Sequence, residues 1–356
     1  MTRYSSNCSG VIELFTKTTE IQILQTVVGI ISILGSLIII VTYFIFLDMK
    51  STARKILVFI SFSDIFTVFP YVINAWYHSH SRNISNCKWQ SFFTTTAVMW
   101  SFFWTSSLAI YVFVVITRKN YDLGEKLMLY FHFFNWLVPI GIVTVSFAIR
   151  KLGCSEALVS GGWCWISMDI GRENAIKWMF ITGKGFEIPS YFIILTFCFL
   201  AARKLKTELR RKRFTFSQES TRVILQGRKK LIAGPVMFVF LRGWGTVRFF
   251  IYVIYPYSDC NLFAKVLAVL HIIGDSSQGF VFFILYCLCT TKFLENCRLL
   301  LSVCCKGNSN RNIREILLKK GMRRAAENEY RKYLLPNDDT KDYNTQGLNE
   351  KYTTIK

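Results

Sequence analysis

Seven apolar stretches, each long enough to cross a lipid bilayer, most constrain what this chain can fold into. A helix rises about 1.5 Å per residue, so about 20 mostly apolar residues span a hydrocarbon core roughly 30 Å thick. Backbone groups must be paired in lipid, and runs of this length pair them as helices, whereas a barrel would show short alternating segments. We predict an all-α membrane protein with spans near residues 21–47, 56–77, 89–116, 126–149, 175–201, 231–255 and 262–288.

The distribution of lysine and arginine over the loops predicts the orientation of the bundle. Arg54 and Lys55 follow the first span, and Arg118 and Lys119 follow the third. The segment between the fifth and sixth spans is the most basic and contains Arg203, Lys204, Lys206, Arg210, Arg211, Lys212, Arg213, Arg222, Arg228, Lys229 and Lys230. Because short basic loops stay in the cytoplasm, we expect the N-terminus outside and a multi-pass protein of the plasma membrane.

Two glycosylation sequons agree with this orientation. They begin at Asn7 and Asn83, and both lie on the side predicted to be extracellular. The formal net charge of +21 could suggest a nucleic-acid partner. However, the basic residues cluster beside apolar spans, where they meet anionic lipid and cytosolic partners, so we expect membrane lipid and no nucleic acid as a partner.

The cysteines near the extracellular side predict one disulfide bond. Cys87 lies at the outer end of the third span and Cys164 in the loop after the fourth, so a bridge between them would hold that loop over the mouth of the bundle. Cys8, Cys154 and Cys260 lie on the same side. Their number is odd, so at least one is expected to be a thiol or to pair between chains.

The region after the seventh span predicts a short amphipathic helix at the inner membrane face. Residues 289–306 repeat apolar side chains with a helical period, and Cys297, Cys304 and Cys305 are candidates for palmitoylation, with ordinary reduced thiols as the alternative. Residues 1–20 are expected to form a short extracellular segment and residues 21–288 the transmembrane domain. Residues 307–356 are polar and are predicted to be a largely disordered cytoplasmic tail.

Polar residues inside the spans are costly in lipid and mark positions that face the bundle interior. The candidates for a ligand contact or a conformational lock are Glu187, Arg242, Arg248, His271, Asp275 and Gln278. The last three share one helix face, because they are spaced at i, i+4 and i+7. Arg242 is expected to pair with Glu187 or Asp275, and such a pair suits both interpretations. Trp100 and Trp104 in the third span are further candidates, although core packing between helices is the simpler interpretation of any single ring.

Three other classes of seven-span protein fit the sequence less well. A retinal-linked protein needs a lysine in the body of the last span, and Lys265 lies near its outer end. A membrane metallohydrolase needs clustered ligands, and the four histidines show no zinc spacing, so we expect no enzyme, metal or cofactor. A transporter or channel of a small solute remains the alternative function, although no repeat or matched pair of broken spans is visible.

Several motifs resemble the cyclic-AMP-receptor-like group of G-protein-coupled receptors. They are residues 32–36 in the first span, residues 61–64 in the second, Cys87 with residues 164–165, and residues 278–280 and 285–287 in the seventh span. The resemblance implies a receptor that binds a small extracellular ligand. It also implies coupling to a heterotrimeric G protein by outward movement of the sixth helix. Candidate contacts for the G protein are Arg118, Lys119, Arg210, Arg211, Lys229 and Lys230.

Departures from neighbouring families refine this resemblance. The rhodopsin-like signatures are replaced by Thr117-Arg118-Lys119 after the third span and by residues 283–286 in the seventh. Secretin-like receptors share the Cys-Trp and Gln-Gly-Phe features but carry a disulfide-rich ectodomain. The roughly twenty residues before the first span hold one cysteine and cannot build such a domain, so a ligand is expected to enter the bundle.

Overall fold

A computed structural model describes residues 12, 15–46, 50–76, 84–118, 121–155, 160, 163–212, 218–255 and 262–305. Among them, six helices are long and apolar enough to cross a membrane, and a bent pair of helices makes the seventh span. All seven spans and the first part of α13, as far as Arg298, belong to one compact unit. The sites Asn7 and Asn83, the residues Cys8, Lys119 and Cys260, and the tail from residue 306 lie outside the described residues.

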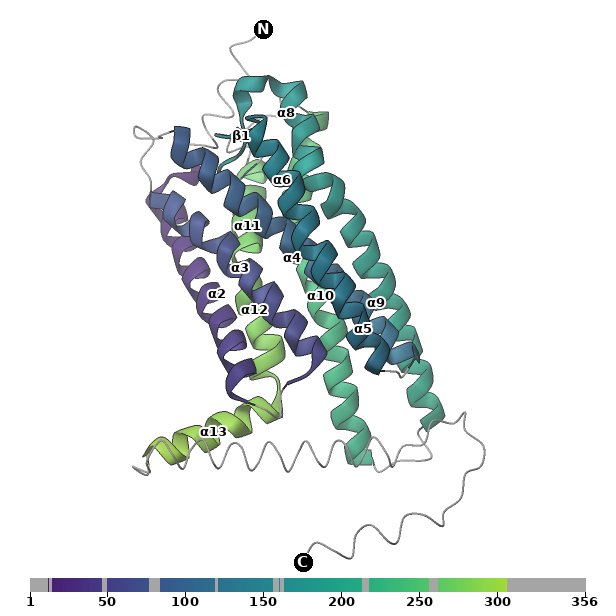
Figure 1. Ribbon diagram of the computed structural model, residues 1–356. Helices are drawn as coiled ribbons and strands as arrows, with labels where there is room; N and C mark the ends of the chain where they lie inside the picture. Colours follow the sequence, from purple (N-terminus) through teal and green to yellow (C-terminus); the bar gives the residue numbers. More distant parts are fainter. Residues whose placement is uncertain are drawn as a thin grey trace, which may run out of the picture. The chain divides into compact units, whose positions relative to one another are not determined.

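The first three spans are α2 (Thr19–Ile45), α3 (Thr52–Trp76) and α4 (Ile84–Arg118). The fourth combines α5 (Tyr121–His132), the π-helix η3 (Phe133–Leu137) and α6 (Val138–Ala148), and the fifth combines α8 (Arg172–Met179), η5 (Phe180–Lys184) and α9 (Gly185–Lys212). The sixth is α10 (Gln218–Ile254). Figure 1 shows these helices running side by side, and α9 and α10 extend well beyond the spans expected from hydropathy.

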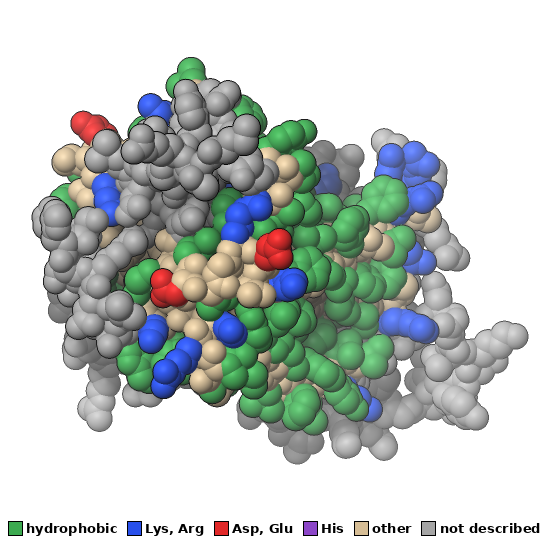
Figure 2. Space-filling model, turned by 90° about the horizontal axis from the view of Figure 1, so that it is seen from above, with side chains coloured by type: hydrophobic (Ala, Val, Ile, Leu, Met, Phe, Trp, Pro, Cys, Tyr) green, Lys and Arg blue, Asp and Glu red, His purple; other side chains and the backbone are tan. Residues whose placement is uncertain are grey.

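The outer surface of the bundle is apolar, as a lipid-facing surface requires. Large hydrophobic side chains such as Leu34, Phe44, Leu129 and Phe192 are exposed on it. Figure 2, which views the molecule from above, shows hydrophobic side chains over much of the sides of the bundle. Small and polar residues such as Ser32, Ser36 and Thr105 are instead buried between helices, so the chain turns its polar groups inward.

The seventh span is broken, whereas the sequence predicts one continuous helix over residues 262–288. It consists of α11 (Leu262–Ser276), α12 (Gln278–Phe283) and η6 (Ile284–Leu288), with a bend of 54° between α11 and the following segment. Ser277 between them leaves the helical conformation, with φ −102° and ψ 0°. The break frees backbone N–H groups, and those of Gly279 and Phe280 donate to Ser32 Oγ at 2.9 and 3.3 Å.

Polar contacts hold α12 against α2 and α3 at this break. Ser32 Oγ and Ser36 Oγ donate to Asp64 Oδ2 at 3.1 and 2.8 Å. A side chain on Gly279 would collide with Ser36 and Asp64, so only glycine allows α12 to approach this closely. The motifs that carried the family resemblance in the first, second and seventh spans therefore meet at one packed contact.

A small hairpin caps one end of the bundle and is the described exception to an all-helical fold. β1 (Leu152–Gly153) pairs antiparallel with β2 (Trp165–Ile166), with Gly153 opposite Trp165. A disulfide joins Cys164, just before β2, to Cys87 in α4, with 5.5 Å between the Cα atoms. The short helix η4 (Met168–Ile170) follows β2, and Figure 1 shows β1 near α8. We call this the capped end of the bundle.

The last described helix, α13 (Thr291–Cys305), occupies the segment predicted to be amphipathic. Phe293 packs against Phe283, with 6.3 Å between the ring centroids. Cys297 is half-buried, and burial raises the pKa of its thiol, which lowers the fraction of reactive thiolate. The side chains of Cys304 and Cys305 lie outside the described residues, so palmitoylation of these cysteines stays a prediction.

Candidate functional site

A cavity with several charged side chains in its walls lies beneath the hairpin at the capped end of the bundle. It contains about 460 Å³ of space, including the part that is open to solvent. Its walls come from the third, fifth, sixth and seventh spans and from the hairpin; they include Thr95, Phe102, Trp163, Trp165, Lys184, Glu187, Arg242, Gly245, His271 and Asp275. Four of the candidate residues from the sequence, Glu187, Arg242, His271 and Asp275, are therefore brought together in one place.

Two tryptophans of the hairpin line the cavity. The rings of Trp163 and Trp165 stack with 5.5 Å between centroids and 25° between planes. Between them in sequence, Cys164 carries the disulfide to α4, and the hydroxyl of Ser91 in α4 donates to the carbonyl of Trp165. The disulfide pair expected from the sequence thus ties this aromatic wall to the third span.

Lys184 and Glu187 form a buried ion pair in the fifth span. Lys184 Nζ lies 2.8 and 2.7 Å from the two carboxylate oxygens of Glu187. Tyr191 donates its hydroxyl to Glu187 at 2.7 Å, and the hydroxyl of Thr246 in α10 also donates to Glu187. With three donors around it, Glu187 can be buried as a carboxylate, and it links the fifth span to the sixth.

Arg242 pairs with Asp275 and not with Glu187, the other partner predicted from the sequence. Arg242 Nη1 lies 3.4 Å from Asp275 Oδ1, and the two side chains are 3 and 10% exposed. Glu187 is unavailable because Lys184 already neutralises it. The pair connects α10 to α11 inside the bundle.

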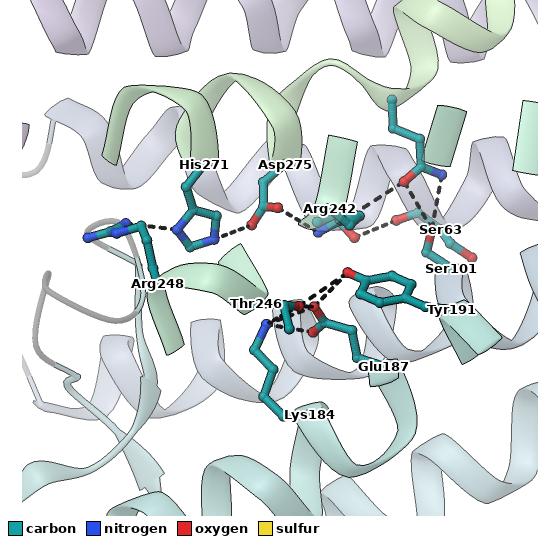
Figure 3. A network of polar contacts seen from close by, with 12 residues as sticks. Ser63, Ser101, Lys184, Glu187, Tyr191, Arg242, Thr246, Arg248, His271 and Asp275 are labelled. Carbon is teal, nitrogen blue, oxygen red and sulfur yellow. Dashed lines mark hydrogen bonds and ion pairs between the residues drawn. The ribbon is translucent and has the colours of Figure 1, made fainter. Parts of the chain in front are cut away.

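The ion pair belongs to a chain of polar contacts that runs along the sixth and seventh spans. His271 Nε2 lies 3.1 Å from Asp275 Oδ2, and Arg248 Nη1 lies 2.8 Å from His271 Nδ1. Figure 3 shows Arg248, His271, Asp275 and Arg242 in a row, with Lys184, Glu187, Tyr191 and Thr246 as a second group beside it. Gly245 permits this arrangement, because a Cβ there would lie 2.6 Å from His271 Nε2.

Gln278 extends the chain of contacts toward the third span. Arg242 Nη2 donates to Gln278 Oε1 at 3.4 Å, and Gln278 Nε2 donates to Ser101 Oγ at 2.9 Å. Gln278 opens α12, directly after the break at Ser277. A change in the position of Arg242 can therefore reach the bend of the seventh span through one hydrogen bond.

Trp100 and Trp104 neither line the cavity nor belong to the chain of polar contacts that includes Arg248 and Gln278. Trp100 packs on Trp136 with 4.8 Å between centroids, and Trp104 is fully buried against Phe59, His132 and Trp136. These rings fill the contact between α3, α4 and the fourth span. Core packing, the simpler of the two interpretations, describes their position.

Lys184 lines the cavity but is not among the candidate residues predicted from the sequence. It lies inside the predicted fifth span and is 6% exposed. A lysine three residues before Glu187 in an apolar span was a visible signal, because i,i+3 spacing places opposite charges on one helix face. The π-helix η5, which ends at Lys184, could not be read from the sequence.

A second group of polar contacts lies at the opposite end of the bundle. Arg54 Nη2 in α3 donates to the carbonyl of Tyr286 at 2.5 Å, and Lys230 in α10 donates to the carbonyl of Cys289. Both cations therefore satisfy carbonyls at the end of the seventh span, where helices leave such groups unpaired. Arg118, Arg210 and Lys229 are exposed, and the side chain of Arg211 lies outside the described residues.

Comparisons with known proteins agree with this architecture. Residues 18–282 match the family model described as 7 transmembrane receptor (Secretin family). The chain is 32% identical over 289 residues to G-protein coupled receptor 157 of Rattus norvegicus, covering 78% of this chain and 83% of that protein. It is 33% identical over 271 residues to G-protein coupled receptor 157 of Homo sapiens, covering 73 and 78%. Cyclic AMP receptor-like protein A of Dictyostelium discoideum is 30% identical over 137 residues, covering 38 and 34%.

Proposed function

Because this chain belongs to the secretin family of seven-transmembrane receptors, we propose that it binds a small extracellular ligand in the capped cavity and activates a heterotrimeric G protein. It is a multi-pass protein of the plasma membrane. The match covers residues 18–282, which include the Cys-Trp and Gln-Gly-Phe features that the chain shares with secretin-like receptors. The proposal places the capped end of the bundle outside the cell.

The main support for the proposal is that buried charged side chains from three spans line one cavity. Lys184 and Glu187 belong to the fifth span, Arg242 to the sixth, and Asp275 to the seventh. A ligand that contacts these groups changes the relative free energy of arrangements in which the spans pair differently. Only such a difference in affinity between arrangements can shift their populations.

The contacts at the opposite end support outward movement of the sixth helix as the response. Lys230 on α10 is tied to the carbonyl of Cys289 after the seventh span, and Gly234 on α10 lies against the Tyr286 side chain. Movement of α10 away from the bundle would break the first contact and open the second. The opened space would accept the C-terminal helix of a Gα subunit. The exposed cations Arg118, Arg210 and Lys229 are proposed to contact that subunit, and Lys119 and Arg211 stay candidates from the sequence.

One structural observation favours the alternative function, transport of a small solute. The break at Ser277 interrupts the seventh span beside buried polar residues, and broken spans are common in transporters. Transporters of that kind carry the break in matched spans of two repeats, whereas the described spans contain one bent pair. The receptor proposal therefore ranks first.

The test is to express the full chain with each Gα family in cells that lack endogenous Gα subunits. Nucleotide exchange on Gα is measured without ligand and with a library of small metabolites, and uptake of the same metabolites is measured in parallel. The receptor proposal expects exchange above that of vector-only cells with at least one Gα family. Uptake of a metabolite without exchange on any Gα would support the transporter instead.

A further inference from the structure

Three cysteine sulfurs meet at the hairpin that covers the cavity. The Sγ atoms of Cys87, Cys154 and Cys164 all lie within 4.8 Å of one another. Cys87 and Cys164 are joined as a disulfide, and Cys154 is a thiol. Cys87 and Cys164 are 4 and 3% exposed, whereas Cys154 is half-buried. Neither the family match nor the disulfide accounts for a third sulfur at this position.

The hairpin holds Cys154 in this position. Cys154 follows β1 directly and Cys164 precedes β2 directly, and Gly153 and Trp165 are paired partners in the two strands. Further hydrogen bonds hold the hairpin at this end. Ser155 Oγ donates to the carbonyl of Trp163 at 2.6 Å. The backbone N–H of Met168 also donates to the carbonyl of Cys154 at 3.2 Å. The pairing of the strands thus accounts for the proximity of Cys154 to Cys164, and the disulfide brings Cys87 to the same place.

We propose that Cys154 exchanges with the Cys87–Cys164 disulfide. The Cys154 thiolate attacks Sγ of Cys164, an S–S bond forms between Cys154 and Cys164, and the bond between Cys164 and Cys87 breaks. The bonding electrons of the broken bond leave on the Cys87 sulfur, which takes up the proton that Cys154 lost to solvent. One disulfide and one thiol are present before and after, so the step needs no oxidant or reductant.

Cys164 is the sulfur attacked, because the hairpin already holds it beside Cys154. The product disulfide would close the hairpin on itself. Cys87 in α4 would then carry the thiol, and the covalent tie between the third span and the wall formed by Trp163 and Trp165 would be lost. Before exchange, the cavity wall is covalently attached to the third span. After exchange, the disulfide lies within the hairpin and that attachment is absent.

Proteolysis with trypsin can distinguish the two disulfides. Cleavage after Arg82 and Lys88 gives the peptide 83–88 with Cys87, and cleavage after Lys151 and Arg172 gives the peptide 152–172 with both Cys154 and Cys164. The Cys87–Cys164 disulfide joins the two peptides. The exchanged disulfide lies inside the second peptide and leaves the first with a thiol that can be alkylated.

The experiment uses the purified full chain in detergent, incubated at pH 7 and pH 8. Samples are quenched in acid, alkylated with a maleimide active at low pH, deglycosylated, digested without reduction and analysed by mass spectrometry. We expect the internally linked peptide 152–172 together with alkylated Cys87. Its initial rate of formation should rise about tenfold with the increase of one pH unit, because the thiolate attacks and thiols have a pKa near 8.5.

Two variants serve as controls. Cys154→Ser should leave only the Cys87–Cys164 linkage at both pH values. Cys198→Ser removes a buried thiol on α9, away from the hairpin, and should exchange at the same rate as the unmodified chain. Alkylated Cys154 with Cys87–Cys164 as the only linkage at both pH values would overturn the proposal. A Cys87–Cys154 linkage would overturn the assignment of Cys164 as the sulfur attacked. The test reads disulfides alone, so its outcome is independent of coupling to a G protein.

Discussion

Arg242 on α10 and Asp275 on α11 form a buried ion pair, with 3.4 Å between Nη1 and Oδ1. The pair lines the cavity and reaches the break in the seventh span through Gln278. Removal of one partner leaves an uncompensated buried charge, which costs about 3–5 kcal/mol. The pair is therefore positioned to hold the sixth and seventh spans in the arrangement that the structure shows.

The first prediction concerns this pair. Arg242→Gln leaves Asp275 with His271 as its remaining partner, so it should raise basal G-protein activation or reduce surface expression severalfold. The exchanged variant Arg242→Asp with Asp275→Arg should recover part of the original behaviour. Surface labelling and basal nucleotide exchange are measured together. If Arg242→Gln matched the unmodified chain in both, the pair would carry no role in either stability or activation.

The second prediction separates the roles of Lys184 and Glu187. Lys184→Met leaves the Glu187 carboxylate with two hydroxyl donors, Tyr191 and Thr246, whereas Glu187→Met leaves Lys184 as a buried cation without a carboxylate partner. Thermal unfolding in detergent should therefore show a larger loss of stability for Glu187→Met. Tyr191→Phe removes the hydrogen bond to the Glu187 carboxylate and a longer contact with Thr246, and it should cost about 1.5–3 kcal/mol, as for hydrogen bonds to charged groups. A larger loss for Lys184→Met than for Glu187→Met would contradict this ranking.

The third prediction concerns the tie between Lys230 and the carbonyl of Cys289. Lys230→Met removes the tie and should raise basal nucleotide exchange, because α10 is then held less firmly against the end of the seventh span. Lys204→Met is the control, since Lys204 on α9 has the same charge, is exposed and is not among the candidate contacts for the G protein. Equal basal exchange for the two variants would show that the tie does not restrain α10.

The fourth prediction tests the close packing of the broken seventh span. Gly279→Ala places a methyl group against Ser36 and Asp64 and should sharply reduce surface expression. Gly141→Ala is the control, because a Cβ at Gly141 meets no atom within 4 Å. Both changes favour a helix by a similar intrinsic amount, so the difference between them measures the packing. Equal expression of the two variants would mean that α12 does not depend on this contact.

The fold was largely predictable from the sequence because lipid imposes strict requirements on it. Seven apolar stretches of sufficient length can satisfy their backbone groups only as helices, so the number and order of spans followed from hydropathy. The break at Ser277 did not follow, because serine is common in spans and the stabilising contact comes from Ser32, far away in the sequence. α9 and α10 are also longer than the apolar segments predicted from hydropathy, because both helices continue through the basic residues that follow or precede those segments.

The candidate site was predictable as a set of residues but not as a set of pairs. The free-energy cost of placing polar side chains in lipid was enough to identify Glu187, Arg242, His271 and Asp275. These four residues line one cavity. Whether Arg242 pairs with Glu187 or with Asp275 depends on how the three helices are rotated about their axes, and the hydropathy pattern does not determine that rotation. The position of Lys184 decided the question, because it neutralises Glu187 and leaves Asp275 for Arg242.

The most direct test of the account is nucleotide exchange on purified heterotrimers, reconstituted with the purified chain in lipid nanodiscs. Each Gα family is measured alone, with the unmodified chain and with Arg242→Gln. Since loss of the pair releases the sixth span, the account predicts exchange above that of the heterotrimer alone for at least one Gα family, and faster exchange with Arg242→Gln. Exchange equal to that of the heterotrimer alone for every Gα family and both proteins would contradict it.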